Sequence, residues 1–290
     1  MTVGRLANGN NPVVYYSLQQ VVSRLTAPDV AKSIPGVTNL LKIAQWNHLL
    51  DKNNRVLPLK PRYPPASNSQ GKMPFIVVEG LDGSGKTRVS TGLSEKLNLQ
   101  LMRTPPNFIK SFKELFDEHN ESIRRAYYSL GNYLAANEVQ YYCFSQGVVM
   151  DRYWHSTAAY ALAHEMTTSG SSAINESDFV WPKDLLQPDL VIFLVVSEET
   201  RRFRHAYRNT TNTKEEQTLA TSETFRKNLI ECYNRINGPP LVQIDANNVS
   251  DDISVDENIA AIIKKVYEVV IDKLNISKIH DDATTGKLSI

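Results

Sequence analysis

Residues 80–87 have types and spacing that could hold the phosphates of a nucleotide, because they read G-L-D-G-S-G-K-T and fit the pattern G-x-x-x-x-G-K-[ST]. In such a loop, glycines let backbone N–H groups turn toward phosphate oxygens, and the N-terminus of the following helix adds partial positive charge. Lys86 then reaches the β- and γ-phosphates, and the hydroxyl of Thr87 binds Mg²⁺. The residues expected to bind ATP are Gly80, Asp82, Gly83, Ser84, Gly85, Lys86 and Thr87.

The segments that flank this loop distinguish it from a chance glycine-rich turn. An apolar, β-branched run at Phe75–Glu79 predicts a strand before the loop, and a helical pattern ending near Leu97 follows it. With glycine at ~7% of average composition, a random match in a chain of this length has odds of roughly one in a hundred. The phosphate-binding interpretation is therefore strongly favoured over a structural turn.

A second set of charged residues follows two further predicted strands. Asp151 can hold Mg²⁺ through water, and the adjacent Arg152 can bridge donor and acceptor phosphates. Another strand ends at Arg103 without a carboxylate, whereas a kinase acting on a neutral hydroxyl usually needs a base near its acceptor. This pattern favours an acceptor that already carries a phosphate. The simpler alternatives are an internal ion pair for Asp151 and Arg152, and a surface cation for Arg103.

Other phosphate-loop proteins fit the sequence less well. A guanine-nucleotide switch usually carries Asn-Lys-x-Asp, which this sequence lacks, and the third strand ends in Asp-Arg-Tyr where a switch has Asp-x-x-Gly. A nucleotide-binding scaffold without turnover remains an alternative. The presence of Lys86, Thr87, Asp151 and Arg152 together argues against it.

Five short apolar runs must position these side chains, at Phe75–Glu79, Leu99–Arg103, Gly147–Met150, Leu190–Val196 and Leu241–Ile244. They alternate with longer segments of helical period, which predicts a parallel sheet covered by helices on both faces. Parallel sheets bind ligands beyond the carboxyl ends of their strands, where each motif above lies. We therefore expect an α/β P-loop kinase fold with a five-stranded parallel sheet flanked by helices and a small helical N-terminal extension.

The chain divides by composition into four regions. Residues 1–57 hold short helical patterns that alone could bury little, and residues 58–72 are rich in Pro, Ser and Asn and predict a linker. We place the kinase domain at 73–275 and a loose tail at 276–290. Residues 1–72 carry nine Lys or Arg and two Asp, a net +7 in a chain of net +1.

Composition also limits the setting of the protein. No run of 18 or more apolar residues occurs, so we expect no membrane insertion, and we expect no nucleic-acid partner. The two cysteines, Cys143 and Cys232, lie in helical patterns and are expected to be buried reduced thiols. The N-terminus has no acidic residue before Asp29, which is compatible with an organelle presequence, although an ordinary helical extension is an equal alternative.

Two stretches resemble the thymidylate kinase family, Phe75–Thr87 and the motif D-R-Y-x-x-S-x-x-A-Y at Asp151–Tyr160. Segments at Arg124–Tyr133, Asp151–Thr157 and Trp181–Leu190 are similar to the mitochondrial UMP/CMP kinase branch of that superfamily. The resemblance covers about Met73 to Leu274.

The resemblance implies roles for individual residues. Asp82 contacts the sugar of the acceptor, Arg103 and Arg152 hold its phosphate, and Tyr160 packs beside the sugar. Thymidylate kinases carry an arginine after Asn in the base-binding helix, whereas this chain has Tyr133 after Asn132, so readout of thymine is in doubt. Both are retained as expected acceptor-binding residues. Residues 198–214 correspond to the lid, with Arg208 as the expected closing arginine and Arg204 as the alternative.

The resemblance thus implies ATP-dependent phosphorylation of a pyrimidine nucleoside monophosphate, UMP, CMP, dUMP or dCMP, with Mg²⁺ as cofactor. The expected catalytic residues are Lys86, Arg152, Arg208 and Asp151, and the expected metal ligands are Thr87 and Asp151. A thymidylate kinase proper is the alternative within the same enzyme class. The branch suggests a mitochondrial location, with a cytoplasmic one as the alternative, and the wider family is compatible with a homodimer.

Overall fold

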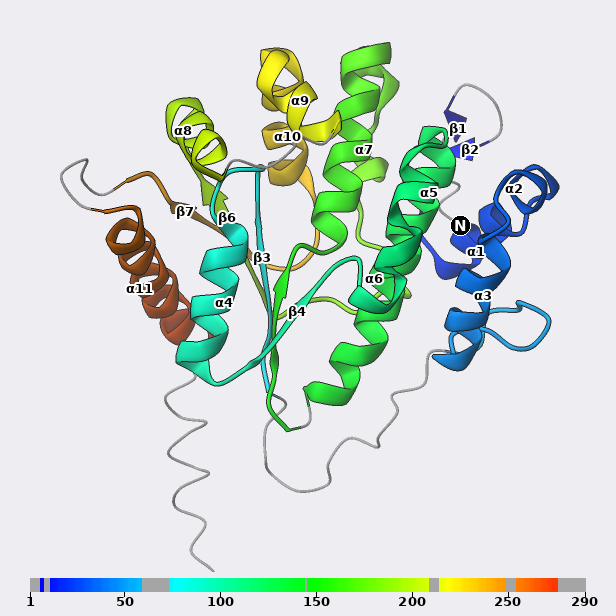
Figure 1. Cartoon of the computed structure of the whole chain (residues 1–290), viewed down its shortest axis with the longest axis horizontal. Helices are drawn as coiled ribbons and strands as arrows, with labels where there is room; N and C mark the ends of the chain where they lie inside the picture. Colours follow the sequence, from blue (N-terminus) through cyan, green and yellow to red (C-terminus); the bar gives the residue numbers. More distant parts are fainter. Residues whose placement is uncertain are drawn as a thin grey trace, which may run out of the picture.

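Five parallel strands form the central sheet of the computed structural model (Figure 1): β3 (Phe75–Gly80), β4 (Gln100–Arg103), β5 (Val148–Asp151), β6 (Leu190–Val195) and β7 (Leu241–Asp245). Their order is β4-β5-β3-β6-β7, and every neighbouring pair is parallel. Each strand was predicted to within one residue at either end. The structure describes residues 6–7, 11–58, 73–143, 145–208, 214–248 and 254–275.

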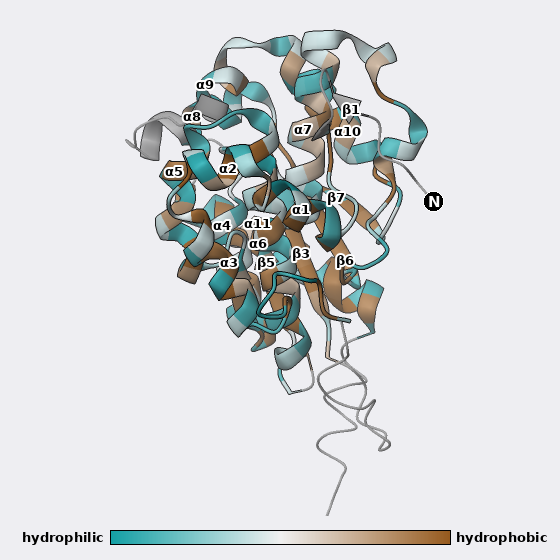
Figure 2. Cartoon of the chain, turned by 90° about the vertical axis from the view of Figure 1, so that its right-hand side faces the viewer, coloured by the Kyte–Doolittle hydropathy of each residue, from teal (hydrophilic) through white to brown (hydrophobic). Residues whose placement is uncertain are grey.

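Both faces of the sheet are buried because successive side chains of each strand point to opposite sides. Ile76 and Val78 of β3 join the cluster under α4 (Lys86–Leu97) and α11 (Val255–Leu274). Phe75 and Val77 join the cluster under α6 (Glu121–Tyr142) and α7 (Trp154–Ser169). This explains why the strands read as continuous apolar runs, and Figure 2 shows β3, β5 and β6 coloured as hydrophobic.

Shorter elements complete the kinase part of the chain. Helix α10 packs on α7, and α5 leads into α6. Helix α8 follows β6 in the region expected to form the lid, and α9 begins where that region ends. Their bounds are α5 (Lys113–Asp117), α8 (Glu198–Arg208), α9 (Lys214–Thr221) and α10 (Glu223–Arg235), with 3-10 turns at Asn107–Phe112, Ser171–Ala173 and Glu176–Phe179.

The N-terminal segment folds against α6 (Figure 1). It contains the short strands β1 (Leu6–Ala7) and β2 (Asn11–Pro12) and the helices α1 (Leu18–Leu25), α2 (Pro28–Ser33) and α3 (Val37–Trp46). Its buried apolar residues from Val13 to Leu50 belong to the same cluster as those of α6 and α7. These helices, which were expected to bury little by themselves, bury their apolar residues in a core that they share with α6 and α7. The four-part division remains a prediction, and both residues 59–72 of its linker and its tail at 276–290 lie outside the described residues.

Two compositional expectations can be compared with this structure. Cys143 and Cys232 are buried reduced thiols, as expected. Within the described ranges, no helix combines the length and the apolar character needed to cross a membrane.

Candidate active site

The predicted phosphate loop connects the end of β3 to the start of α4, as its flanking patterns indicated. Gly83 has a positive φ of 88°, and a Cβ there would lie 2.9 Å from the backbone oxygen of Arg201. Real Cβ atoms do not approach an oxygen so closely, so the position needs glycine for both conformation and space. The loop therefore lies directly against α8, the first helix of the expected lid.

Lys86 is held at the floor of this loop. Its side chain is 6% exposed, and Nζ donates a hydrogen bond to the backbone oxygen of Leu81 at 2.7 Å. Nζ also lies 3.8 Å from Asp82 Oδ1. Burial, with a smaller contribution from the charge of Arg152, lowers the pKa of Lys86 to about 8. A buried cation with one short bond to a carbonyl would gain a stronger partner in a phosphate oxygen.

Thr87 and Asp151 meet at the edge of the sheet, where Thr87 Oγ1 donates to Asp151 Oδ2 at 2.7 Å. Asp151 is 7% exposed, and its second oxygen, Oδ1, is buried without a hydrogen-bond partner among the described residues. Leaving a buried polar atom unsatisfied is costly, so this oxygen fits a bound cation or its water.

The cation chemistry that fits this pair is that of Mg²⁺, which keeps several waters and takes few protein ligands. In the part of the chain that the structure describes, no group of three or more His, Cys, Asp or Glu side chains gathers as a metal site. A hydroxyl and one carboxylate beside a phosphate loop therefore match a metal held mainly by nucleotide phosphates and water.

A cavity of about 180 Å³ opens over the phosphate loop, lined by loop residues and by side chains from α8 and α11. Phe203 of α8 is 53% exposed and lines it, together with Ile259 of α11. Arg204, which also lines this cavity, donates to the backbone oxygens of Ser84 at 3.1 Å and Ala246 at 2.8 Å. This cavity, called the donor cavity below, can hold the phosphates of a nucleotide over the loop.

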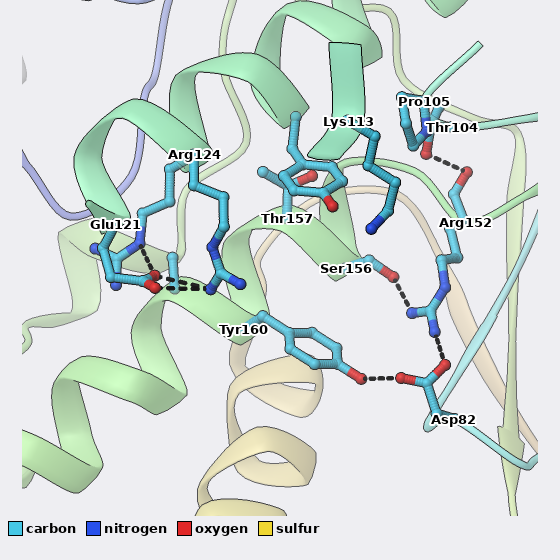
Figure 3. A pocket seen from close by; sticks show the side chains of 13 residues that line it. Asp82, Thr104, Pro105, Lys113, Glu121, Arg124, Arg152, Ser156, Thr157 and Tyr160 are labelled. Atoms are coloured by element: carbon cyan, nitrogen blue, oxygen red, sulfur yellow. Dashed lines mark hydrogen bonds and ion pairs between the residues drawn. The ribbon is translucent and has the colours of Figure 1, made fainter. Parts of the chain in front are cut away.

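A second cavity of about 270 Å³ adjoins the first and is shown in Figure 3. Both cavities are lined by Asp82 and Arg152. Arg152 forms an ion pair with Asp82 and donates to Ser156 Oγ at 3.0 Å. Asp82 also accepts a hydrogen bond from the hydroxyl of Tyr160 at 3.1 Å. We call this space the acceptor cavity, because it adjoins the phosphate loop through Arg152 and Asp82 and so could hold the second substrate.

A buried carboxylate supports Arg152 from behind. Glu79, fully buried at the end of β3, accepts from the Ser156 hydroxyl at 2.5 Å and from the Tyr153 backbone N–H at 2.8 Å. Ser156 thus passes a hydrogen bond from Arg152 to Glu79. Burial raises the pKa of the Glu79 carboxyl above its usual range. Neither residue was expected to have a functional role from the sequence, although Ser156 is the serine of the motif D-R-Y-x-x-S-x-x-A-Y.

The far end of the acceptor cavity is polar. Glu121 lies 2.8 Å from Arg124 and 3.3 Å from Arg125, all in the first turns of α6. Burial opposes ionisation of Glu121, but the two arginines lower its pKa below the usual range. From α5, Lys113 points into the same space (Figure 3), and its Nζ lies 2.5 Å from Asp117. The cavity can therefore offer both hydrogen-bond donors and an acceptor to a bound molecule.

Three residues expected at the acceptor are not on the wall of this cavity. Asn132 and Tyr133 are buried in the core, where Asn132 donates to Thr157 Oγ1 at 2.9 Å and the Tyr133 hydroxyl to Asp184 Oδ1 at 2.6 Å. They lie on the inner side of α6, so their side chains complete the core. Arg103 is exposed at the end of β4, and the next two residues, Thr104 and Pro105, line the cavity in its place.

The other expected residues lie together. Asp82 and Arg152 line both cavities, Tyr160 lines the acceptor cavity, and the donor cavity is lined by Gly83, Gly85, Lys86, Thr87 and Asp151. Gly80 and Ser84, which were also expected to bind ATP, are buried and line neither cavity. Arg208 ends α8, and its side chain lies outside what the structure describes.

One side of α6 lines the acceptor cavity with polar residues that were not expected from the sequence. Glu121, Arg124, Arg125 and Tyr128 recur at i, i+3, i+4 and i+7, which places them on one side of a helix. That spacing is visible in the sequence. It is hard to recognise because the same helix also carries buried aromatic residues, Tyr127 and Tyr133, that follow a helical spacing of their own.

Comparisons with known proteins agree with this geometry. The family model described as thymidylate kinase matches residues 78–256. The human protein named UMP-CMP kinase 2, mitochondrial, is 37% identical over 186 residues, which is 63% of this chain but only 41% of the human protein. The thymidylate kinase of Leptospira borgpetersenii is 29% identical over 191 residues, covering 62% of this chain and 88% of its own length.

Among solved structures, a thymidylate kinase from Candida albicans matches with a TM-score of 0.52 and 18% identity, over 70% of this chain and 93% of its own. At that identity the match supports the fold alone, and it agrees with the predicted P-loop kinase architecture. The family model covers more than half of this chain, so the expected enzyme class, a nucleoside monophosphate kinase, is confirmed. The chain belongs to the thymidylate kinase family.

Proposed function

We propose that this chain transfers the γ-phosphoryl group of ATP to a pyrimidine nucleoside monophosphate, with UMP, CMP, dUMP and dCMP as its acceptors. The observation that supports this most directly is that the donor cavity and the acceptor cavity meet at Arg152 and Asp82. A cation at that junction can contact the phosphates of both substrates. Transfer between phosphates needs positioning and charge neutralisation and no general base on the protein.

In this proposal the phosphate loop and Lys86 bind the β- and γ-phosphates of ATP. Arg152 bridges the γ-phosphate and the acceptor phosphate and stabilises the charge that develops between them. Asp82 orients Arg152 through their ion pair and contacts the acceptor sugar, beside Tyr160. Kinases of this class use ATP with Mg²⁺, and Thr87 and Asp151 are the residues that would hold the metal, which neutralises phosphate charge when bound.

The closing arginine is assigned from the lid segment. Arg208 ends α8, and we retain it as the residue that reaches the phosphates when the lid closes. Arg204 has a different role in the proposal, because it already binds the backbone oxygens of Ser84 and Ala246. It holds α8 against the phosphate loop.

One feature of the acceptor cavity supports a pyrimidine as the acceptor base. Glu121 and Arg124 at its far end present a carboxylate and a guanidinium, so the wall can accept from an amino group and donate to a carbonyl. The human relative named as a UMP-CMP kinase points to the same acceptors.

An ADP-release assay with ATP and a panel of CMP, UMP, dCMP, dUMP and dTMP tests the proposal. We expect kcat/KM for at least one of the first four to exceed that for dTMP by about tenfold, a difference of about 1.4 kcal/mol. A preference for dTMP would favour the alternative, a thymidylate kinase proper. If none of the five nucleotides leads to ADP release, both kinase assignments are contradicted and a binding scaffold is supported.

The setting of the protein is part of the proposal. The human relative carries the word mitochondrial in its name, and residues 1–72 are basic, so we propose a mitochondrial location. Imaging of a C-terminal fluorescent fusion tests it, and a diffuse cytoplasmic signal would contradict it. A homodimer is compatible with the family, and sedimentation equilibrium distinguishes one chain of 32.7 kDa from two.

A further inference from the structure

The far wall of the acceptor cavity is held from outside by the N-terminal segment. Arg125 lines this cavity, yet it is only 8% exposed. Its Nη1 donates to the backbone oxygen of Val13 at 3.3 Å, and its Nη2 lies 3.5 Å from His164 Nδ1. One acceptor of this buried guanidinium therefore comes from a part of the chain more than a hundred residues away in sequence.

A second attachment binds the first turn of α6. Tyr15, 1% exposed, donates its hydroxyl to the backbone oxygen of Ser122 at 3.0 Å. Arg24 Nε donates to Ser122 Oγ at 2.8 Å, while its two terminal nitrogens bind Asp29 at 3.0 and 2.8 Å. Ser122 lies between Glu121 and the two arginines, so these bonds fix the turn that carries the polar end of the cavity.

A third attachment joins α1 to the core behind the cavity. Asp184 accepts from the backbone N–H of Leu18 with one carboxylate oxygen, at 2.8 Å, and from the Tyr133 hydroxyl with the other, at 2.6 Å. The buried residues of α1 pack on α6 within one apolar cluster. Figure 1 shows α1 to α3 lying along α6, on the side away from α4 and α11.

From these three attachments we infer that residues 13–25 are a positioning part of the acceptor site. They hold Arg125 and the first turn of α6 in place, and so set the affinity for the acceptor. Both cavities share Asp82 and Arg152, but the rest of the donor cavity is lined by the phosphate loop, Asp151, α8 and α11, so we expect affinity for ATP not to depend on residues 13–25. The inference rests on the proposed function of the acceptor cavity. It also opposes a domain boundary at residue 73, because a chain that starts there lacks the partners of Arg125 and Ser122.

The experiment uses two single variants of the full chain, Tyr15→Phe and Arg24→Met. For each one we measure KM for the best acceptor, KM for ATP, kcat and the thermal midpoint. Lys32→Met is the matched control, since Lys32 is an exposed cation in the neighbouring helix α2. Loss of the hydrogen bond to Ser122 in either variant is expected to raise the acceptor KM about 5- to 10-fold. KM for ATP and kcat should stay within about twofold, and the control should match the wild type.

The split between the two KM values separates positioning from general destabilisation. A variant that is only less stable would lower the active fraction without changing either KM. The inference is overturned if the wild type is active and both variants keep the wild-type acceptor KM, or if the two KM values rise together. A wild type inactive on every acceptor overturns the proposed function first, and the inference with it.

Discussion

Thr87 donates its hydroxyl to Asp151 across 2.7 Å, joining the first turn of α4 to the end of β5. Each strand of this parallel sheet ends at the same edge, so residues 64 positions apart in sequence become neighbours. The second oxygen of Asp151 is buried and has no hydrogen-bond partner in the described ranges. This pair defines the place where metal, phosphate loop and sheet edge meet in the proposed mechanism.

Asp151→Asn should lower kcat/KM by about 100-fold and raise the Mg²⁺ concentration needed for half-maximal activity. The amide still accepts a hydrogen bond from Thr87, so the fold is kept while the charge that attracts the metal is lost. A Mg²⁺ titration of initial rates measures both effects. Asp272→Asn, at an exposed position of α11, is the control. An unchanged Mg²⁺ requirement would remove Asp151 from the metal site.

Lys86→Met should reduce kcat by about 100-fold or more and leave the thermal midpoint near that of the wild type. The substitution keeps the length of the buried stem but removes the cation that binds the β- and γ-phosphates. Steady-state rates and thermal denaturation are the two measurements. Lys96→Met, on the exposed side of the same helix, should behave as the wild type. Near-normal turnover of Lys86→Met would contradict the phosphate-loop account.

Glu79→Gln should lower kcat/KM for the acceptor about tenfold, with little change in KM for ATP. Glutamine has only one acceptor oxygen, so Ser156 loses either its backbone or its side-chain partner and no longer fixes Arg152. Initial rates at varied acceptor and varied ATP measure the two terms separately. Glu95→Gln, an exposed position on α4, is the control. An equal decrease in kcat/KM for the acceptor and for ATP would argue for a general structural role of Glu79.

The stability of the protein should fall in mild acid because of His155. The ring is 1% exposed, its centroid lies 5.2 Å from that of Trp181, and burial lowers its pKa to about 3 from the ordinary 6.5. Between these values the unfolded chain binds a proton that the folded chain does not. The contribution of neutral His155 to the free energy of unfolding is therefore fully present above about pH 6.5. It is lost as pH decreases, by up to about 1.4 kcal/mol per pH unit.

Urea unfolding at pH 7.5 and pH 5.5 tests this acid effect. His155→Gln should show a smaller difference between the two pH values than the wild type, even though it is less stable at pH 7.5. His48→Asn, which removes an exposed histidine, should keep the wild-type difference. The same acid loss in His155→Gln and in the wild type would assign it to other groups.

The sheet and the phosphate loop were predictable because their signals are local. A strand that is buried on both faces is apolar at every position, so it can be recognised without knowing which face packs on the core. The phosphate loop carries its glycines and its lysine within eight residues. Strand bounds accordingly agree to within one residue. The sheet edge then determines where Asp151 and Arg152 lie relative to Lys86.

The acceptor cavity was less predictable because its wall depends on which side of α6 faces the core. The helix is apolar on more than one side, since the N-terminal segment covers part of it. Tyr133 therefore packs inward against Asp184, while Arg125 turns to the cavity and to Val13. Contacts between Val13 and Arg125, or Arg24 and Ser122, span about a hundred positions and leave no periodic trace in the sequence.

The most direct test of the account follows the labelled phosphate itself. The wild-type chain is incubated with Mg²⁺, ATP labelled at the γ-phosphate, and CMP or UMP, and the products are separated. The account predicts that the label appears in the nucleoside diphosphate, in an amount equal to the ADP formed, and that Lys86→Met abolishes it. Label found only in inorganic phosphate, or left in ATP with every pyrimidine monophosphate, would contradict it.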